Sequence, residues 1–195
     1  MDRYQSFKDL EKYETEFSVE SLDRKSLVTI VAHHGGNIEP HTTEIAVLIA
    51  GDDYNLFCLN GCKDDNNRDL HLTSHQFDHA LAIDLVQKAS LVIAVHGCTV
   101  REPIVYLGGL DGVLMHHIST KLTGQKIANE CGNRRFAGTH KDNICNRGRK
   151  RKGVQLEISR GLRDSADAHK KIASAVQSAV ALIKKQGEAR ELPLP

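Results

Sequence analysis

The sequence predicts an α/β fold, a three-layer sandwich built on a mostly parallel mixed sheet. Two observations predict it: apolar, β-branched segments of strand length alternate along the chain with amphipathic segments of helix length, and each strand ends in glycine-rich or polar residues. A chain of 195 residues has the usual size of one domain, so we expect a single domain over residues 1–195.

The first half of the chain predicts strand, helix and strand after an N-terminal lead-in. Residues 1–20 are polar and mixed in charge, with a short helix expected at 5–14. SLVTIVA, residues 26–32, has the length and composition of a buried strand. A proline near the start and a glycine at the end of residues 40–51 predict a helix of about three turns. YNLFCL at 54–59 predicts the next strand.

The alternation continues through the middle of the chain. We expect a short extended piece at 70–74, an amphipathic helix at 77–89 and a buried strand, SLVIAVHG, at 90–97. IVYLGG at 104–109 predicts a strand with a glycine turn, and a helix is expected over 110–122.

The last third begins with a long loop. Residues 131–153 are rich in Asn, Gly, Arg and Lys and show little periodicity, and loops of this length in compact domains are often functional. GVQLEIS at 153–159 predicts the last strand, with Gln155 and Glu157 on one face. An amphipathic helix is expected at 166–185, and residues 188–195 predict a frayed tail.

Composition and charge narrow the function classes. Lys plus Arg number 26 against 25 Asp plus Glu, so no overall field attracts a polyanion, and nucleic acid is not an expected partner. No apolar run is long enough to span a bilayer, and no secretory signal is evident, so we expect no membrane partner and a cytoplasmic protein, or an extracellular one after lysis if it is phage-encoded. The five cysteines are expected to be reduced, and their spacing does not complete a four-cysteine zinc site.

Histidines follow two of the buried strands. SLVTIVA ends at His33 and His34, and SLVIAV ends at His96, so these side chains are expected beyond the carboxyl ends of the strands, where α/β sheets place their functional crevice. Glu39 follows His34 by five residues, and the glycines between them allow the carboxylate to turn back. Two histidines and one carboxylate form a common catalytic zinc set. The sequence therefore predicts one Zn²⁺ per chain held by His34, Glu39 and His96.

Two alternatives to this set remain open from the residues alone. His41 and Glu44 form a His-x-x-Glu pair in the first turns of the predicted helix, although that spacing faces outward as readily as inward. His33 is expected to point away from His34 if the strand alternation persists, so that only one of the two enters the site.

Glu157 is the predicted catalytic base. A carboxylate in the middle of an apolar strand needs a partner, either water at the metal or an arginine such as Arg160 or Arg163. For substrate binding we expect Asn146, Arg147 and Arg163, because a guanidinium matches the planar geometry of a carboxylate. The basic run at 147–152 is interpreted as a solvated surface, with nucleic-acid binding as the alternative function.

Six segments of the chain together resemble the poly-γ-glutamate hydrolases of phages and bacteria, zinc enzymes with a fold similar to that of the metallocarboxypeptidases. The segments run over nearly the whole chain in order: HGGNIEPHTTEIA (34–46), LHLTSHQFD (70–78), VHGC (95–98), VYLGGLD (105–111), NICNRG (143–148) and GVQLEISRGLR (153–163). The resemblance implies His34, Glu39 and His96 as zinc ligands, Glu157 as the catalytic carboxylate, and Asn146 and Arg147 as contacts of a substrate carboxylate. This chain departs from the family pattern at His33, where proline is common, and at His41, where glycine is usual.

The expected function is therefore hydrolysis of γ-glutamyl amide bonds of poly-γ-glutamate by metal-activated water. The alternative enzymatic function is that of a zinc amidohydrolase of a small N-acyl or N-formyl amino acid, with a small glutamate amide in place of the acidic polymer.

Overall fold

The computed structural model describes residues 2–191, and it contains the predicted α/β sandwich with a seven-stranded mixed sheet. The strand order is β1-β3-β2-β4-β7-β5-β6. The strands are β1 Phe17–Leu22, β2 Val28–Gly36, β3 Asn55–Gly61, β4 Leu91–Cys98, β5 Val105–Gly109, β6 Asn129–Cys131 and β7 Val154–Ser159. The α-helices are α1 Phe7–Leu10, α2 Thr42–Ala50, α3 Ala80–Lys88, α4 Gly112–Gly124, α5 Arg160–Arg163 and α6 Ala166–Glu191.

The centre of the sheet is parallel and its edges are mixed. β3, β2, β4 and β7 run parallel to one another, whereas β1 is antiparallel to β3 and β5 is antiparallel to β7. Parallel strands need crossover helices on both faces, which explains why the central strands are buried along nearly their whole length. The predicted mostly parallel mixed sheet is confirmed.

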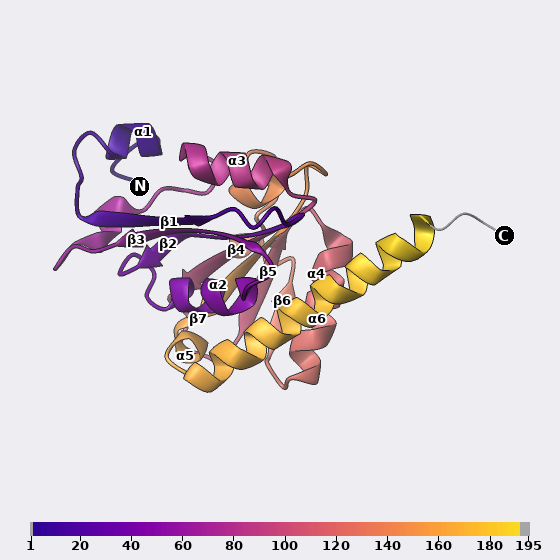
Figure 1. Ribbon diagram of the computed structural model, residues 1–195. Helices are drawn as coiled ribbons and strands as arrows, with labels where there is room; N and C mark the ends of the chain where they lie inside the picture. The colour runs from indigo at the N-terminus through magenta and orange to yellow at the C-terminus, as the bar shows by residue number, and fades with distance from the viewer. Residues whose placement is uncertain (1, 192–195) are drawn as a thin grey trace.

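Two hydrophobic clusters, one on each face of the sheet, hold the layers together. In β2, Ile30 packs with α2, α4 and α6, while the next residue, Val31, packs with α1 and α3 on the other face. Figure 1 shows the two layers, with α1 and α3 above the sheet and α2, α4, α5 and α6 below it. Burial of both faces therefore follows from the alternation of side chains along each strand.

The differences from the expected elements lie at the edges. The helix expected at 5–14 is confined to α1, and the sequence pattern did not predict β1, although its alternating half-buried side chains are typical of an edge strand. Residues 71–73 after the 3₁₀ helix Asn67–Leu70 form no strand. The backbone stays helical to Glu191 where a tail from 188 was expected, and residues 192–195 lie outside the described residues.

The long loop contains two short 3₁₀ helices, Arg134–Phe136 and Ile144–Arg147, separated by irregular backbone. Within the part of the chain that the structure describes, no helix is long and apolar enough to cross a membrane.

The packing of α6 against the sheet provides a test of the core. Ile172 is fully buried in α6, so Ile172→Ala should lower the free energy of unfolding by about 2 to 5 kcal/mol through lost burial and the cavity left behind. Leu81→Ala in α3 removes a similar aliphatic side chain that is 51% exposed, and it should cost roughly 0.5 kcal/mol or less. Urea denaturation of both variants checks this, and equal losses would contradict the assignment of Ile172 to the core.

Candidate active site

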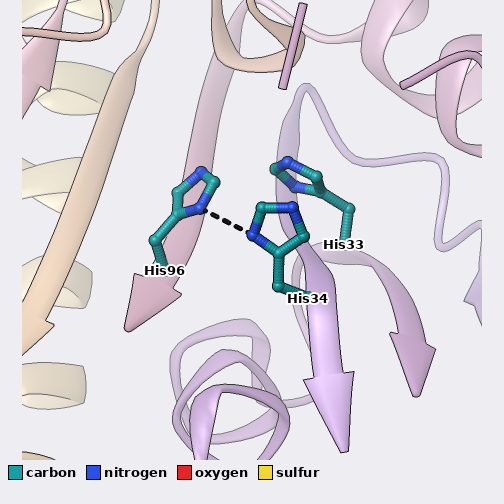
Figure 2. Close-up of side chains that lie close together, drawn as sticks. All are labelled: His33, His34 and His96. Atoms are coloured by element: carbon teal, nitrogen blue, oxygen red, sulfur yellow. Dashed lines mark hydrogen bonds between the residues drawn. The ribbon is translucent and has the colours of Figure 1, made fainter. Parts of the chain in front are cut away.

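Two parallel strands bring their histidines to the same edge of the sheet. β2 pairs with β4 from Val28 to Val31, so both strands end at the crevice, one with His34 and the other with His96. The Nδ1 atoms of the two rings lie 3.2 Å apart, and both rings are buried (Figure 2).

Glu39 turns back to these two rings. The backbone N–H of Glu39 donates to the carbonyl of His34 at 2.9 Å, which closes the turn after β2. Glu39 Oε1 then lies 3.3 Å from His34 Nδ1, and Glu39 Oε2 lies 3.9 Å from His96 Nδ1. The N–H of Gly97 donates to Glu39 Oε2 at 2.8 Å and anchors the carboxylate on β4. The three residues expected from the sequence to hold a metal are therefore brought together.

The donor atoms have spacings that suit a small divalent ion. Ligands bound tetrahedrally to zinc at about 2.0 to 2.1 Å lie roughly 3.3 Å from one another, close to the separations just given. Two sets of side chains come close enough to share one ion: His33 with His34 and His96, and His34 with Glu39 and His71. The ligands expected from the sequence, His34, Glu39 and His96, include members of both sets. Their fit to zinc rests on the facing Nδ1 atoms of the two histidines and on the Glu39 carboxylate beside them.

The second nitrogen of each histidine is also engaged. His34 Nε2 lies 2.7 Å from the carbonyl oxygen of Leu72 and must donate to it, so when the ring is neutral its Nδ1 carries the lone pair that faces the cavity. His96 Nε2 lies 3.4 Å from Ser74 Oγ, which lies 3.1 Å from His33 Nε2. Such partners fix the orientation and tautomer of metal-binding histidines.

His33 does not point away from the site, and that expectation from strand alternation is wrong. The pairing of β2 with β3 shifts between Ala32 and Gly35, where three steps along β2 match two along β3. This bulge breaks the period of two, so the ring of His33 lies 4.1 Å from that of His34 and 4.6 Å from that of His96. Nδ1 of His33 is buried without a hydrogen-bond partner among the described residues.

Glu157 lies across the same cavity. β7 pairs with β4 so that Glu157 is opposite His96, and its side chain lines a cavity of about 340 Å³ together with His34, Glu39 and His96. Its Oε1 accepts a hydrogen bond from Gln155 Nε2 at 3.3 Å. Within residues 2–186, no ion pair joins Glu157 to Arg160 or Arg163, the alternative partners expected from the sequence.

The cavity holds its ionisable groups in different protonation states. Burial, followed by the negative charge of Glu39, raises the pKa of Glu157 to about 8. Burial would also raise the pKa of Glu39, but the charge and hydrogen bond of His34 outweigh it and hold that pKa at about 2. Burial, followed by the charge of His34, lowers the pKa of His96 to about 3. The site thus has one carboxylate that stays ionised and one carboxyl group that holds its proton more tightly than an exposed glutamate does.

Asn146 and Arg147 do not line this cavity. Asn146 is fully buried, and its Nδ2 donates to the carbonyls of Gly138 at 2.8 Å and His140 at 3.0 Å. The guanidinium of Arg147 donates to three backbone carbonyls, those of Asp142, Phe77 and His75. Gly138 and His75 line the cavity, so Asn146 and Arg147 contact the backbone of the cavity wall without lining the cavity themselves.

Arg163 and the alternative pair lie apart from the facing Nδ1 atoms. Arg163 is buried, and its guanidinium donates to the backbone carbonyls of Ile158, Pro40 and Cys98. His41 Nδ1 lies 3.5 Å from Glu44 Oε1 on the surface, and neither residue belongs to the two candidate metal sets.

Several cavity residues were not predicted from the sequence, among them Arg68, His71, Ser74 and Arg135. His71 stacks on His34 with ring centroids 4.1 Å apart, and its Nδ1 lies 2.8 Å from Asp2 Oδ1. His71 and Ser74 belong to the segment LHLTSHQFD, whose resemblance to the family implied no role for either residue. The sequence pattern contained no signal that distinguished these residues from polar residues elsewhere in the chain.

Comparisons with known proteins find relatives of this chain in Bacillus subtilis. The prophage-derived protein YoqZ of Bacillus subtilis (strain 168) is 33% identical over 162 residues, covering 81% of this chain and 59% of YoqZ. YndL of the same strain is 30% identical over 168 residues, covering 84% of this chain and 66% of YndL. The chain thus spans about two thirds or less of the length of these two relatives.

Solved structures match over nearly the whole chain. A bacteriophage poly-gamma-glutamate hydrolase superposes with a TM-score of 0.92 at 28% identity, covering 95% of this chain and 100% of that one. A zinc-free form of YndL superposes with a TM-score of 0.88 at 25% identity, covering 93% and 98%. The family model described as poly-gamma-glutamate hydrolase matches residues 4–185, and the chain accordingly belongs to the poly-γ-glutamate hydrolase family.

Proposed function

We propose that the protein is a zinc-dependent hydrolase that cleaves γ-glutamyl amide bonds of poly-γ-glutamate. The observation that carries the proposal is the convergence of His34 Nδ1, His96 Nδ1 and the Glu39 carboxylate on one cavity that also contains Glu157. The family model and the bacteriophage hydrolase support the substrate class, and the zinc-free form of YndL supports the metal.

The donor set fits zinc. The Leu72 carbonyl holds the His34 ring in the tautomer that presents Nδ1, and the Gly97 N–H holds Glu39 beside it. Two imidazoles and one carboxylate leave a position open for water or substrate, which is typical of catalytic rather than structural zinc sites. The chemistry that zinc supplies when bound is Lewis acidity, which polarises an amide carbonyl and lowers the pKa of water to about 7.

Glu157 is assigned as the proton carrier. Its carboxylate accepts the proton of the attacking water and passes it to the nitrogen of the leaving amine, so the residue is restored after each cycle. The burial that raises the pKa of Glu157 makes it a stronger base than an exposed carboxylate. Glu39, whose pKa is about 2, stays ionised and suits the ligand role.

Arg135 and the 131–153 loop are assigned to the substrate. Arg135 is an exposed member of the cavity lining, and its guanidinium lies over the ring of Phe136 at 5.1 Å. We assign to it a contact with an α-carboxylate of the glutamate chain. Asn146 and Arg147 then act on the substrate indirectly, by holding the backbone of the loop that carries Arg135.

Substitution of Glu157 tests the catalytic assignment. Glu157→Gln keeps the shape of the side chain but removes its basicity, so turnover of poly-γ-glutamate should fall by about 10² to 10⁴ while zinc content is unchanged. Glu44→Gln, which changes an exposed carboxylate of the alternative pair, should retain turnover. Viscometry or gel analysis of the polymer measures the activity, and full activity of Glu157→Gln would make Glu157 a structural residue.

Metal analysis tests the ligand set. Protein purified without added zinc should contain about one zinc per chain by elemental mass spectrometry, and His96→Ala should lose most of it because zinc then keeps only two of its protein ligands. His116→Ala, which removes an exposed histidine on α4, should bind zinc as the native chain does. Equal zinc contents in the two variants would contradict the proposed site.

The pH dependence of stability tests the environment of Glu157. The pKa of Glu157 is raised in the folded state, so metal-free protein should lose stability as the pH rises from about 4.5, its ordinary value, through about 8. Glu157→Gln cannot ionise there, so its stability relative to the native chain should rise over the same interval. Urea denaturation of chelator-treated samples measures the difference, and parallel profiles for the two proteins would refute a raised pKa.

A further inference from the structure

A second cavity adjoins the candidate active site. It has a volume of about 370 Å³ and shares Glu39, Arg68, Gly97 and Thr99 with the first cavity. Its remaining lining residues are Ile38, Pro40, Arg101, Arg160 and Arg163. We call it the arginine pocket, after Arg68, Arg101, Arg160 and Arg163. Because the two cavities share four lining residues, they lie side by side, within reach of one extended ligand.

The arginine pocket has an excess of positive charge. Four guanidinium groups line it against one carboxylate, that of Glu39, which faces the histidines. Arg68 and Arg101 are exposed, and within residues 2–186 neither side chain takes part in an ion pair or a hydrogen bond. Of the four arginines, Arg160 alone forms an ion pair with an acidic side chain of residues 2–186, with its Nε 2.8 Å from Asp164 Oδ1.

Arg163 adds a buried charge behind the pocket. Its guanidinium donates to the carbonyls of Ile158, Pro40 and Cys98, all of them neutral, and no carboxylate of residues 2–186 forms an ion pair with it. A Cβ on Gly97 would lie 2.5 Å from Cζ of Arg163, so the glycine allows the guanidinium to pack against β4. The negative charge of Glu39 acts on Arg163 without a direct ion pair, so the guanidinium is not neutralised by contact, and its poorly screened charge favours an anion in the pocket.

We infer that the arginine pocket binds a carboxylate of an acidic chain, one or more residues away from the bond that is cleaved. This inference rests on the proposed function. Each residue of a γ-linked glutamate chain keeps a free α-carboxylate, so a chain running from the active site into the pocket presents one carboxylate in each. Guanidinium groups bind carboxylates through paired hydrogen bonds, which match Arg68 and Arg101 at the opening. The pocket would thus favour polymer over a single glutamate amide.

Direct binding tests the arginine pocket without turnover. The zinc-loaded full chain carrying Glu157→Gln is titrated against a fluorescently labelled γ-linked glutamate oligomer, and anisotropy gives the Kd. Adding Arg101→Gln should weaken binding about tenfold or more. Adding Arg149→Gln, which removes an exposed arginine of the long loop that lines neither cavity, should change the Kd less than about twofold. An equal loss of affinity in the two variants would overturn the inference, because it would mean that binding depends on the net charge of the protein and not on the pocket.

Turnover separates this inference from the proposed function. If zinc-loaded native protein cleaves no γ-glutamyl bond, the proposed function fails, whereas the binding result still decides the pocket. If native protein cleaves the polymer, Arg101→Gln should raise KM for the polymer more than KM for a γ-glutamyl dipeptide, with kcat for the polymer changed less. An equal rise in both KM values would overturn the pocket and leave the proposed function standing. Urea denaturation of Arg101→Gln confirms that the variant is folded.

Discussion

The parallel pairing of β2, β4 and β7 is the constraint on which the rest of the structure depends. Register places Val31 beside Ala94 and His96 beside Glu157, so three strands end at one edge with polar side chains that would be costly alone in the core. The two histidines find partners there, because their Nδ1 atoms face each other and the Gly97 N–H holds Glu39 beside them. The hydrophobic layers on both faces hold this register, because a slip by one residue would move each side chain into the cluster on the other face.

The same burial that makes the site costly gives its two carboxyl groups different roles. Glu39 lies against His34, and the positive charge of His34 keeps the pKa of Glu39 at about 2. Glu157 has no such cationic partner, and burial raises its pKa to about 8. Two groups whose environments separate their pKa values are a common basis for dividing ligand and acid–base roles in one site. The residues behind the histidines, Ser74 and the Leu72 carbonyl, make this arrangement specific by fixing the rings.

Charge on the approach to the site differs from the near-neutral balance of the whole chain. A formal net charge of +1 predicts no long-range attraction, yet Arg68, Arg101 and Arg163 come from three distant segments and gather beside the candidate active site. A local excess of positive charge attracts an anion only to that part of the surface, which a uniformly basic surface would not do.

The sequence by itself determined the parallel core and the residues that end its strands, because buried strands must be apolar and a polar residue at their ends is conspicuous. His34 and His96 were therefore recognisable near strand ends, and Glu157 as a carboxylate within an apolar strand. Glu39 follows His34 by five residues, and the assembly of the four in one cavity follows from strand direction. Only the tertiary structure decided the position of His33, because the bulge in β2 depends on pairing with β3. It likewise decided that the Arg147 side chain turns inward to backbone carbonyls. It also decided the grouping of Arg68, His71 and Arg135, because exposed polar residues have no periodic signal until the fold brings them to one surface.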